Sequence, residues 1–208
     1  VLGGFLATVA RTQALETGIQ VLVKKLKGNE LKLIPILMFI FSIGGTTYGM
    51  LEETVGFYAL LAAAMVMAGM DTIVSSAIVL LGAGSGVLGS TINPFAVGAA
   101  VSSLPEGIEV NQGIIIMIGI ILWLTTLTIS IFFVRNYAKK VIAKKGSTIL
   151  SLRERKEMEM EYGAAAVKKE ENVKLTNKQV ITLILFALTF LVMIVAFIPW
   201  PDFGVTIF

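Results

Sequence analysis

The sequence contains neither cysteine nor histidine. The absence of cysteine excludes a disulfide framework, a thiol nucleophile and a Cys/His metal site. The absence of histidine excludes a Ser-His-Asp triad and a histidine proton relay. Charged residues are scarce too, at 15% of 208 residues, against 56% hydrophobic residues and a mean hydropathy of +0.86. Soluble domains average roughly 25% charged and about 45–50% apolar residues, so the composition predicts a membrane protein.

Lysine and arginine are absent from residues 33–134, and every basic residue falls in one of the two flanking stretches. The positive-inside rule places both stretches in the cytoplasm. An even number of membrane crossings must therefore lie between them. The connection 102–112 carries only Glu106 and Glu109 as charged residues, and a connection of this kind fits the outside.

Five hydrophobic runs predict the membrane segments of an all-α protein, a polytopic membrane helical bundle. A helix needs about 20 apolar residues to cross a bilayer. The last two runs fit single crossings, whereas the second run is too long for one and must fold back on itself. The runs span residues 1–10, 33–70, 72–101, 113–134 and 180–198.

The charge map also predicts how these segments are threaded. Residues 72–101 run from inside to outside and residues 113–134 return, so residues 33–70 leave from and return to the cytoplasmic side. Each arm of this segment has only about 17 residues, roughly 25 Å of helix, which is short for a full crossing. A re-entrant hairpin is favoured, which requires surrounding protein or a wet cavity. A full two-helix hairpin is the alternative.

The chain is expected to be an internal piece of a longer protein, because it does not begin with methionine and its first residues are already apolar. Residues 1–134 would form a partial first transmembrane repeat, residues 135–178 a cytoplasmic linker, and residues 179–208 the first helix of a second half. Acids alternate with bases in the linker, which predicts a solvated helix with i,i+4 ion pairs and argues against a nucleic-acid partner.

Residues 12–27 form a separate amphipathic segment. Leu15, Ile19, Leu22 and Leu26 share one helical face, and the charged residues lie elsewhere. The pattern fits a helix that lies on the cytoplasmic membrane surface in contact with lipid. A connecting helix packed on the protein fits it equally.

A glycine-rich turn interrupts the 33–70 run. Gly44, Gly45 and Gly49 fall within six residues, and two adjacent acids, Glu52 and Glu53, follow. Glycines in this density predict a turn. A carboxylate at the centre of a membrane helix costs at least ~2.5–3.5 kcal/mol, so the acids need a cavity, a partner or a proton. They would bind a coupling cation, carry a proton or meet a cationic substrate; alternatively, they would cap the second arm.

A second interruption lies within residues 72–101. Pro94 removes a backbone donor and disfavours helical geometry at Asn93, while Ser90 and Thr91 add side-chain oxygens. Asn93 is well placed to cap a new half-helix that begins at Pro94. A discontinuous helix of this type is typical of ion and substrate sites in transporters. A kinked helix without a ligand is the alternative.

Gly82, Gly84 and Gly86 match a dinucleotide-binding loop only superficially. They lie in an apolar segment, with no preceding strand and no ribose-binding acid about twenty residues further on. Close packing between helices, through Gly82 and Gly86, is expected instead.

Four short motifs stand out together: Gly3-Gly4-Phe5, Lys27–Glu30, Gly44–Glu53 and Asn93–Phe95. With these motifs the chain resembles the YfcC family, which is related to the DcuC C4-dicarboxylate carriers. The resemblance implies a protein of two inverted repeats, of which this chain would be the first repeat, the linker and the start of the second. It also implies a homodimer.

The same resemblance implies where the site lies. Each repeat would carry a re-entrant hairpin and a broken helix, which together bind the coupling ion and the substrate. In this sequence the hairpin tip corresponds to Gly45–Thr47 and the break to Ser90–Pro94. The tip reads Gly-Thr-Thr-Tyr, whereas better-studied dicarboxylate carriers often use Ser-Asn-Thr, so their ion chemistry does not carry over directly.

The predicted function is secondary transport of a small organic anion of the C4-dicarboxylate type, or of an amino acid, across the bacterial cytoplasmic membrane. Coupling to Na⁺ or H⁺, or exchange, would drive it, with no enzyme activity and no other cofactor. A basic amino acid antiporter is the alternative, and a channel is a third possibility that the clustering of polar residues disfavours. Lipid, substrate and the second repeat are the expected partners. The expected ligands are Gly45, Thr46, Thr47, Glu52, Glu53, Ser90, Thr91, Asn93 and Pro94.

Overall fold

The computed structural model describes residues 8–9, 11–25, 29–105, 108, 110–143, 147–163 and 174–197. This part of the chain is helical and contains no strand, which confirms the predicted all-α class. Among its helices, Glu30–Thr47 and Gln112–Ala143 are long and apolar enough to cross a membrane. Together with the composition, these helices make the structure a helical membrane bundle.

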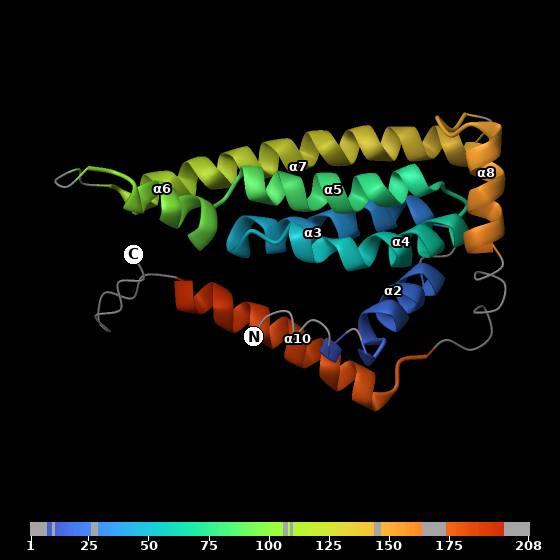
Figure 1. The fold of residues 1–208 in the computed structure, drawn as a ribbon, viewed down its shortest axis with the longest axis horizontal. Helices are drawn as coiled ribbons and strands as arrows, with labels where there is room; N and C mark the ends of the chain where they lie inside the picture. Colours follow the sequence, from blue (N-terminus) through green and yellow to red (C-terminus); the bar gives the residue numbers. More distant parts are fainter. Residues whose placement is uncertain are drawn as a thin grey trace.

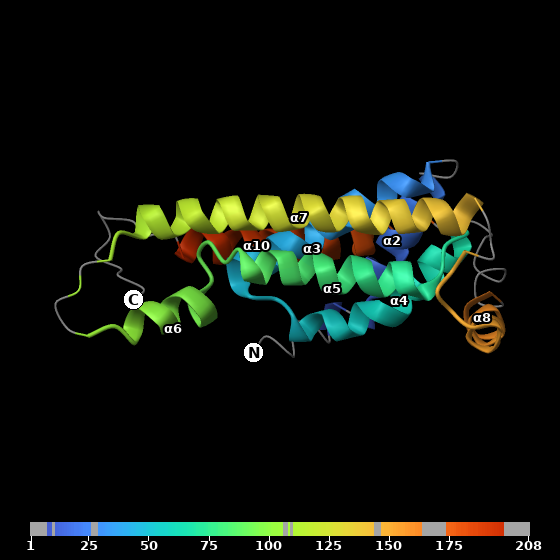
Figure 2. The same cartoon turned by 90° about the horizontal axis from the view of Figure 1, so that it is seen from above.

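Four helices lie side by side along the long axis of the molecule (Figures 1 and 2). Their shared core is entirely apolar at its centre, where the side chains of Leu33, Met38, Met65 and Ile78 have no exposed surface. A short 3-10 helix precedes each of the first two. The elements are η1 (Glu30–Lys32), α3 (Leu33–Tyr48), η2 (Glu52–Thr54), α4 (Val55–Met67), α5 (Thr72–Leu88) and α7 (Gln112–Ala143).

Helices α3 and α5 run parallel to each other. Gly82 of α5 lies against Met38 of α3, and one turn later Gly86 lies against Ser42 and Thr46, so the contacts advance in the same direction along both helices. Helix α4 returns the chain between them. The end of α3 is therefore level with the end of α5, and this places the two sequence interruptions close together.

Helix α7 runs antiparallel to α5. Asp71, directly before α5, meets Tyr137, and Gly89, directly after it, meets Trp123. At ~1.5 Å per residue, the 32 residues of α7 extend roughly 48 Å, well beyond a hydrocarbon core of about 30 Å. Its exposed surface is rich in large apolar side chains, as expected for a lipid-facing helix: Ile114, Met117, Ile121, Ile129, Phe132 and Phe133.

The segment predicted as a broken helix, residues 72–101, begins as α5 and leaves helical geometry at Gly89. Helical structure resumes with a π-helical turn, Pro94–Gly98, and continues as α6 (Ala99–Ser102). Both views show this second piece turned away from the axis of α5 (Figures 1 and 2). The helix is therefore interrupted and redirected, and does not merely bend.

Helices α2 (Ala14–Lys25) and α10 (Asn177–Phe197) contact each other beside the bundle. Gln179 joins the two helices, because its side-chain Nε2 donates to Thr17 Oγ1 at 3.1 Å. The side chains of Leu15, Ile19, Leu22 and Leu26 lie outside the described residues. The apolar face predicted for this segment therefore stays a prediction.

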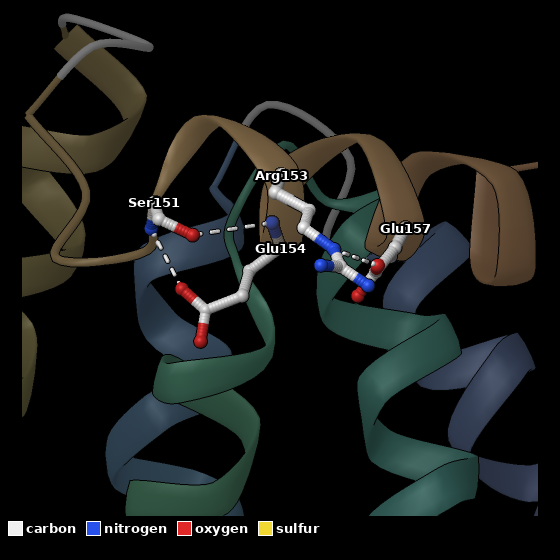
Figure 3. Close-up of polar contacts among 4 residues, drawn as sticks. All are labelled: Ser151, Arg153, Glu154 and Glu157. Atoms are coloured by element: carbon white, nitrogen blue, oxygen red, sulfur yellow. Dashed lines mark hydrogen bonds and ion pairs between the residues drawn. The ribbon is translucent and has the colours of Figure 1, made fainter.

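The linker contains α8 (Leu152–Met158) and a π-helical turn, Glu159–Gly163. Ser151 caps α8: its Oγ accepts from Glu154 N at 3.3 Å, and its backbone N donates to Glu154 Oε2 at 2.8 Å (Figure 3). These bonds hold the pKa of Glu154 below its usual value. Their contribution to folding stability is therefore complete above the pKa of Glu154 in the unfolded chain, and it is lost as the pH falls through the pKa in the folded chain. Arg153 and Glu157 form a predicted i,i+4 ion pair at 2.8 Å.

Candidate functional site

The hairpin tip predicted at Gly45–Thr47 is wrong in position, because these residues still belong to α3 (Leu33–Tyr48). The chain turns at Gly49, which has a φ of +80°. Residues with a side chain rarely adopt this conformation. The Gly49 N–H donates to Gly45 O at 3.0 Å, and Met50 N donates to Gly44 O at 3.2 Å, which closes α3. A Cβ on Gly49 would come within 2.7 Å of Asn93 Nδ2. Glycine therefore lets the tip turn and also lets it approach the helix break.

Thr46 joins the tip to the break through hydrogen bonds in both directions. Its Oγ1 donates to Gly89 O at 2.7 Å and lies 3.3 Å from Thr91 Oγ1. In return, the backbone N and the Oγ1 of Thr91 donate to Thr46 O at 3.0 and 3.2 Å. Both threonines are buried, with Thr46 only 1% exposed. We call these contacts the tip–break clamp (Thr46, Gly89 and Thr91).

Asn93 organises the break itself. Its Oδ1 accepts from Phe95 N at 2.9 Å and from Ala96 N at 3.3 Å, which confirms its predicted role as the cap of the second half-helix. Its Nδ2 donates to Ser90 Oγ at 3.1 Å. The side chain is 1% exposed, so the break is a buried polar element. Pro94 is the first residue of the half-helix, as the sequence predicts.

Glycines bring the backbones of α3 and α5 into contact below the clamp. A Cβ on Gly86 would overlap the Ser42 carbonyl oxygen and come within 2.7 Å of Thr46 N. A Cβ on Gly45 would overlap the Ala83 carbonyl oxygen, and one on Gly82 would lie 3.1 Å from Met38 Cα. The predicted close packing through Gly82 and Gly86 is confirmed. Small residues permit this kind of approach between membrane helices.

The remaining predicted residues lie apart from the clamp. Thr47 Oγ1 donates to Ile43 O, within its own helix, at 2.6 Å. Glu52 lies in η2 and is exposed, and the side chain of Glu53 lies outside the described residues. At the N-termini of η2 and α4, the capping residues Leu51 and Thr54 make no side-chain cap bond. Glu52 therefore does not lie at the buried centre of a helix, and the roles predicted for Glu52 and Glu53 stay predictions.

Two residues near the ends of α5 were not predicted. Asp71 is buried, with 2% of its surface exposed, and caps α5 by accepting from Val74 N at 3.0 Å. An acid directly before an apolar run is a capping signal, and this signal would have identified it. The indole Nε1 of Trp123 is buried with no hydrogen-bond partner in the described part of the chain. Its ring stacks on Phe39 with a centroid distance of 6.1 Å, and no local pattern marks it.

The clamp and the break offer oxygen ligands. The hydroxyls of Thr46, Ser90 and Thr91 lie beside carbonyl groups at the C-terminal ends of α3 and α5, and one of these, Gly89 O, lies outside the helix. Unwound carbonyls and hydroxyls of this kind bind monovalent cations in transporters. The first N–H groups of the half-helix are already taken by Asn93. An anion at that terminus would have to displace the Asn93 carboxamide.

A protein-family model described as "C4-dicarboxylate anaerobic carrier" (DcuC) matches residues 1–204. The chain belongs to the DcuC carrier family. This confirms the resemblance seen in the sequence motifs, and it makes the chain part of a membrane transporter family. No solved structure matches the chain.

Two proteins are similar to this chain over about two thirds of its length. An uncharacterised protein of Haemophilus influenzae is 36% identical over 144 residues, which cover 69% of this chain and 27% of that protein. A protein of Escherichia coli named "Putative basic amino acid antiporter YfcC" is 34% identical over 141 residues, covering 68% of this chain and 27% of that protein. The alignments thus span about a quarter of each relative.

Proposed function

We propose that the DcuC-family protein containing this chain is an ion-coupled secondary carrier in the bacterial cytoplasmic membrane. It moves a small organic anion of the C4-dicarboxylate type, or an amino acid, and spans the membrane several times. The observation that carries the proposal is the tip–break clamp, in which Thr46 and Thr91 join a hairpin tip to an interrupted helix. Buried polar breaks in otherwise apolar membrane helices are energetically costly, and such breaks therefore mark functional sites.

The hairpin is proposed to be re-entrant. The clamp lies beside Gly119 of α7, because a Cβ on Gly119 would come within 2.6 Å of Ser90 O. Gly119 is seven residues from the start of α7 at Gln112, roughly 10 Å along the helix. The tip therefore ends short of the outer end of α7. The arms, 16 residues in α3 and 13 in α4, are also short for full crossings.

Within this site, we assign a coupling Na⁺ to the oxygens of Thr46, Ser90, Thr91 and Asn93. A coupling H⁺ would instead be carried by Glu52 or Glu53, because hydroxyl and carboxamide oxygens are too weakly basic to hold a proton. Gly45 and Pro94 shape the backbone around the Na⁺ ligands, and Thr47 extends the polar tip. Glu52 is exposed at the tip, where a substrate or the second repeat can reach it. Glu52 and Glu53 are the charge-sensitive part of the site. The second repeat, a homodimer partner and lipid complete the assembly, and no further cofactor is needed.

A basic amino acid antiporter is the second candidate. The name of the Escherichia coli relative refers to basic amino acids, whereas the family name refers to dicarboxylates. The exposed acid Glu52 favours a cationic substrate over a dianion, because like charges disfavour binding. Uptake of dicarboxylates and of basic amino acids by the full-length protein in proteoliposomes, with and without Na⁺, separates the two candidates.

Neutralising the acids at the tip is expected to change transport. In Glu52→Gln and Glu53→Gln variants, uptake should fall at least about tenfold or lose its ion dependence, because about 1.4 kcal/mol of lost charge interaction corresponds to that factor. Glu157→Gln, in the exposed linker helix, is the matched control and should leave uptake unchanged. Uptake and ion dependence that stay at wild-type levels in both tip variants would remove the role assigned to these acids.

The orientation is testable with cysteines, because this chain has none of its own. A membrane-impermeant maleimide should label Gly107→Cys from outside in intact cells. Thr47→Cys should stay unlabelled from outside, since a re-entrant tip does not emerge there. Labelling of Gly107→Cys from the cytoplasm alone would reverse the topology, and rapid external labelling of Thr47→Cys would indicate a fully spanning hairpin.

A further inference from the structure

Asp71 is a buried carboxylate that the proposed transport site does not use. It lies at the start of α5, at the end of that helix opposite the break. Besides capping α5, its Oδ2 accepts from Tyr137 Oη at 2.6 Å and from Thr148 Oγ1 at 2.5 Å. These donors belong to α7 and to the linker, 66 and 77 residues away. One carboxylate therefore joins three separate segments.

The backbone of the linker is tied to the same cluster. Ile149 N donates to Tyr137 Oη at 3.1 Å, and Leu150 N donates to Thr148 Oγ1 at 3.2 Å. The hydroxyls of Tyr137 and Thr148 are 3.3 Å apart. The linker is held here by side-chain and main-chain bonds together. We call Asp71, Tyr137 and Thr148 the linker latch.

The burial of Asp71 makes the latch specific. No lysine or arginine in the described part of the chain pairs with this carboxylate, and within that part it is stabilised by hydrogen-bond donors. Hydrogen bonds to an ionised group are roughly twice as strong as neutral ones. A buried acid that loses a donor is left with an unsatisfied lone pair in a poorly polar site. The carboxylate therefore favours the arrangement in which the linker is docked.

The linker also forms one wall of a partly open pocket next to the latch. A space of about 220 Å³ lies between the end of the bundle and α8, and its lining includes Met70, Asp71, Thr148, Arg155 and Glu159. Figure 1 shows α8 lying across this end of the bundle. Release of the linker would remove one wall of this pocket. The docked linker thus covers the start of α5.

We propose that Asp71 is a positioning residue that couples the linker to the broken helix. Helix α5 is continuous from Thr72 to Leu88, roughly 25 Å of rigid rod, with the latch at one end and the break at the other. Because the linker is attached to the rod, its position and that of the break are linked. The latch itself does not depend on the proposed function, and only its effect on transport rests on that proposal.

The latch is tested by hydrogen–deuterium exchange in the purified full-length protein. Exchange at Ile149 and Leu150 should become at least tenfold faster in Tyr137→Phe and in Thr148→Val. Thr148→Ser keeps the hydroxyl and should exchange like the wild type. Tyr58→Phe is the matched control, because the Tyr58 hydroxyl has no hydrogen bond among the described residues. Wild-type exchange in both Tyr137→Phe and Thr148→Val would overturn the latch.

The coupling is tested by transport kinetics on the same variants. Tyr137→Phe and Thr148→Val should lower the maximal uptake rate at least threefold with an unchanged KM, and Thr148→Ser should restore it. Faster exchange with unchanged kinetics would mean that the latch holds the linker in the wild type but has no effect on transport, and this result would overturn the coupling. If the wild type moves no substrate, the proposed function fails, while the exchange experiment still decides whether the latch exists.

Discussion

Replacing Gly86 with alanine is expected to separate α3 from α5. The added methyl group would overlap the Ser42 carbonyl oxygen and approach Thr46 N to 2.7 Å. Both are backbone atoms of a neighbouring helix, so neither can move away alone. Overpacking typically costs about 1–3 kcal/mol, and here the displacement would also break the tip–break clamp. The variant should therefore lose stability and transport together.

Gly84→Ala is the matched control for this experiment. Gly84 lies in the same helix, but a Cβ on it would have no atom within 4 Å. Alanine favours a helix over glycine by about 1 kcal/mol, so this variant should be as stable as the wild type or more so. The measurement is thermal unfolding in detergent. Gly86→Ala should lower the Tm by at least about 3 °C, and equal Tm values for the two variants would contradict the close packing described here.

Replacing Thr46 with valine is expected to disable the site with little change in shape. Valine removes the donor that satisfies Gly89 O. A buried carbonyl left without its donor costs about 1–3 kcal/mol, and a loss of ~1.4 kcal/mol in the transport transition state is tenfold in rate. Initial uptake in proteoliposomes should therefore fall by about tenfold or more. Thr46→Ser keeps the donor and should retain most of the activity.

The control for Thr46→Val is the same substitution at Thr128. The Thr128 hydroxyl is exposed on α7 and donates to Leu124 O, in its own helix, at 2.6 Å. The substitution removes the same hydroxyl group without touching the clamp. Uptake should be unaffected. If Thr46→Val transports as well as Thr128→Val does, the clamp is a packing contact and not part of the site.

Local signals in the sequence were enough to predict the parts of the site that depend on neighbouring residues. Asn93 followed by Pro94 predicts a cap and a new half-helix, because capping geometry involves residues only two or three positions apart. The spacing of Gly82 and Gly86 likewise places both on one helical face, which predicts a close helix contact. The pairing of the tip with the break came from the family resemblance, because their separation of 43 to 45 residues leaves no local pattern.

The charged residues show where sequence reasoning was insufficient. The contacts of Asp71 with Tyr137 and Thr148 could not be predicted, because these partners are 66 and 77 residues away in the sequence. Its capping role, in contrast, follows from its position directly before an apolar run. For Glu52, the apolar surroundings in the sequence suggested burial, yet the residue falls in the turn between two helices and is exposed. Apolar neighbours in the sequence are a poor predictor of burial at a turn, because a turn projects its side chains away from the helix that it ends.

The parallel arrangement of α3 and α5 also sets an order for the biogenesis of the protein. The side chain of Thr46 bonds to Gly89 and Thr91, which the ribosome adds more than forty residues later. Until then, the polar tip would enter hydrocarbon unpaired, at a cost of several kcal/mol for each unsatisfied group. The α3–α4 hairpin should therefore wait at the membrane surface during translation and insert only once α5 is available as its template.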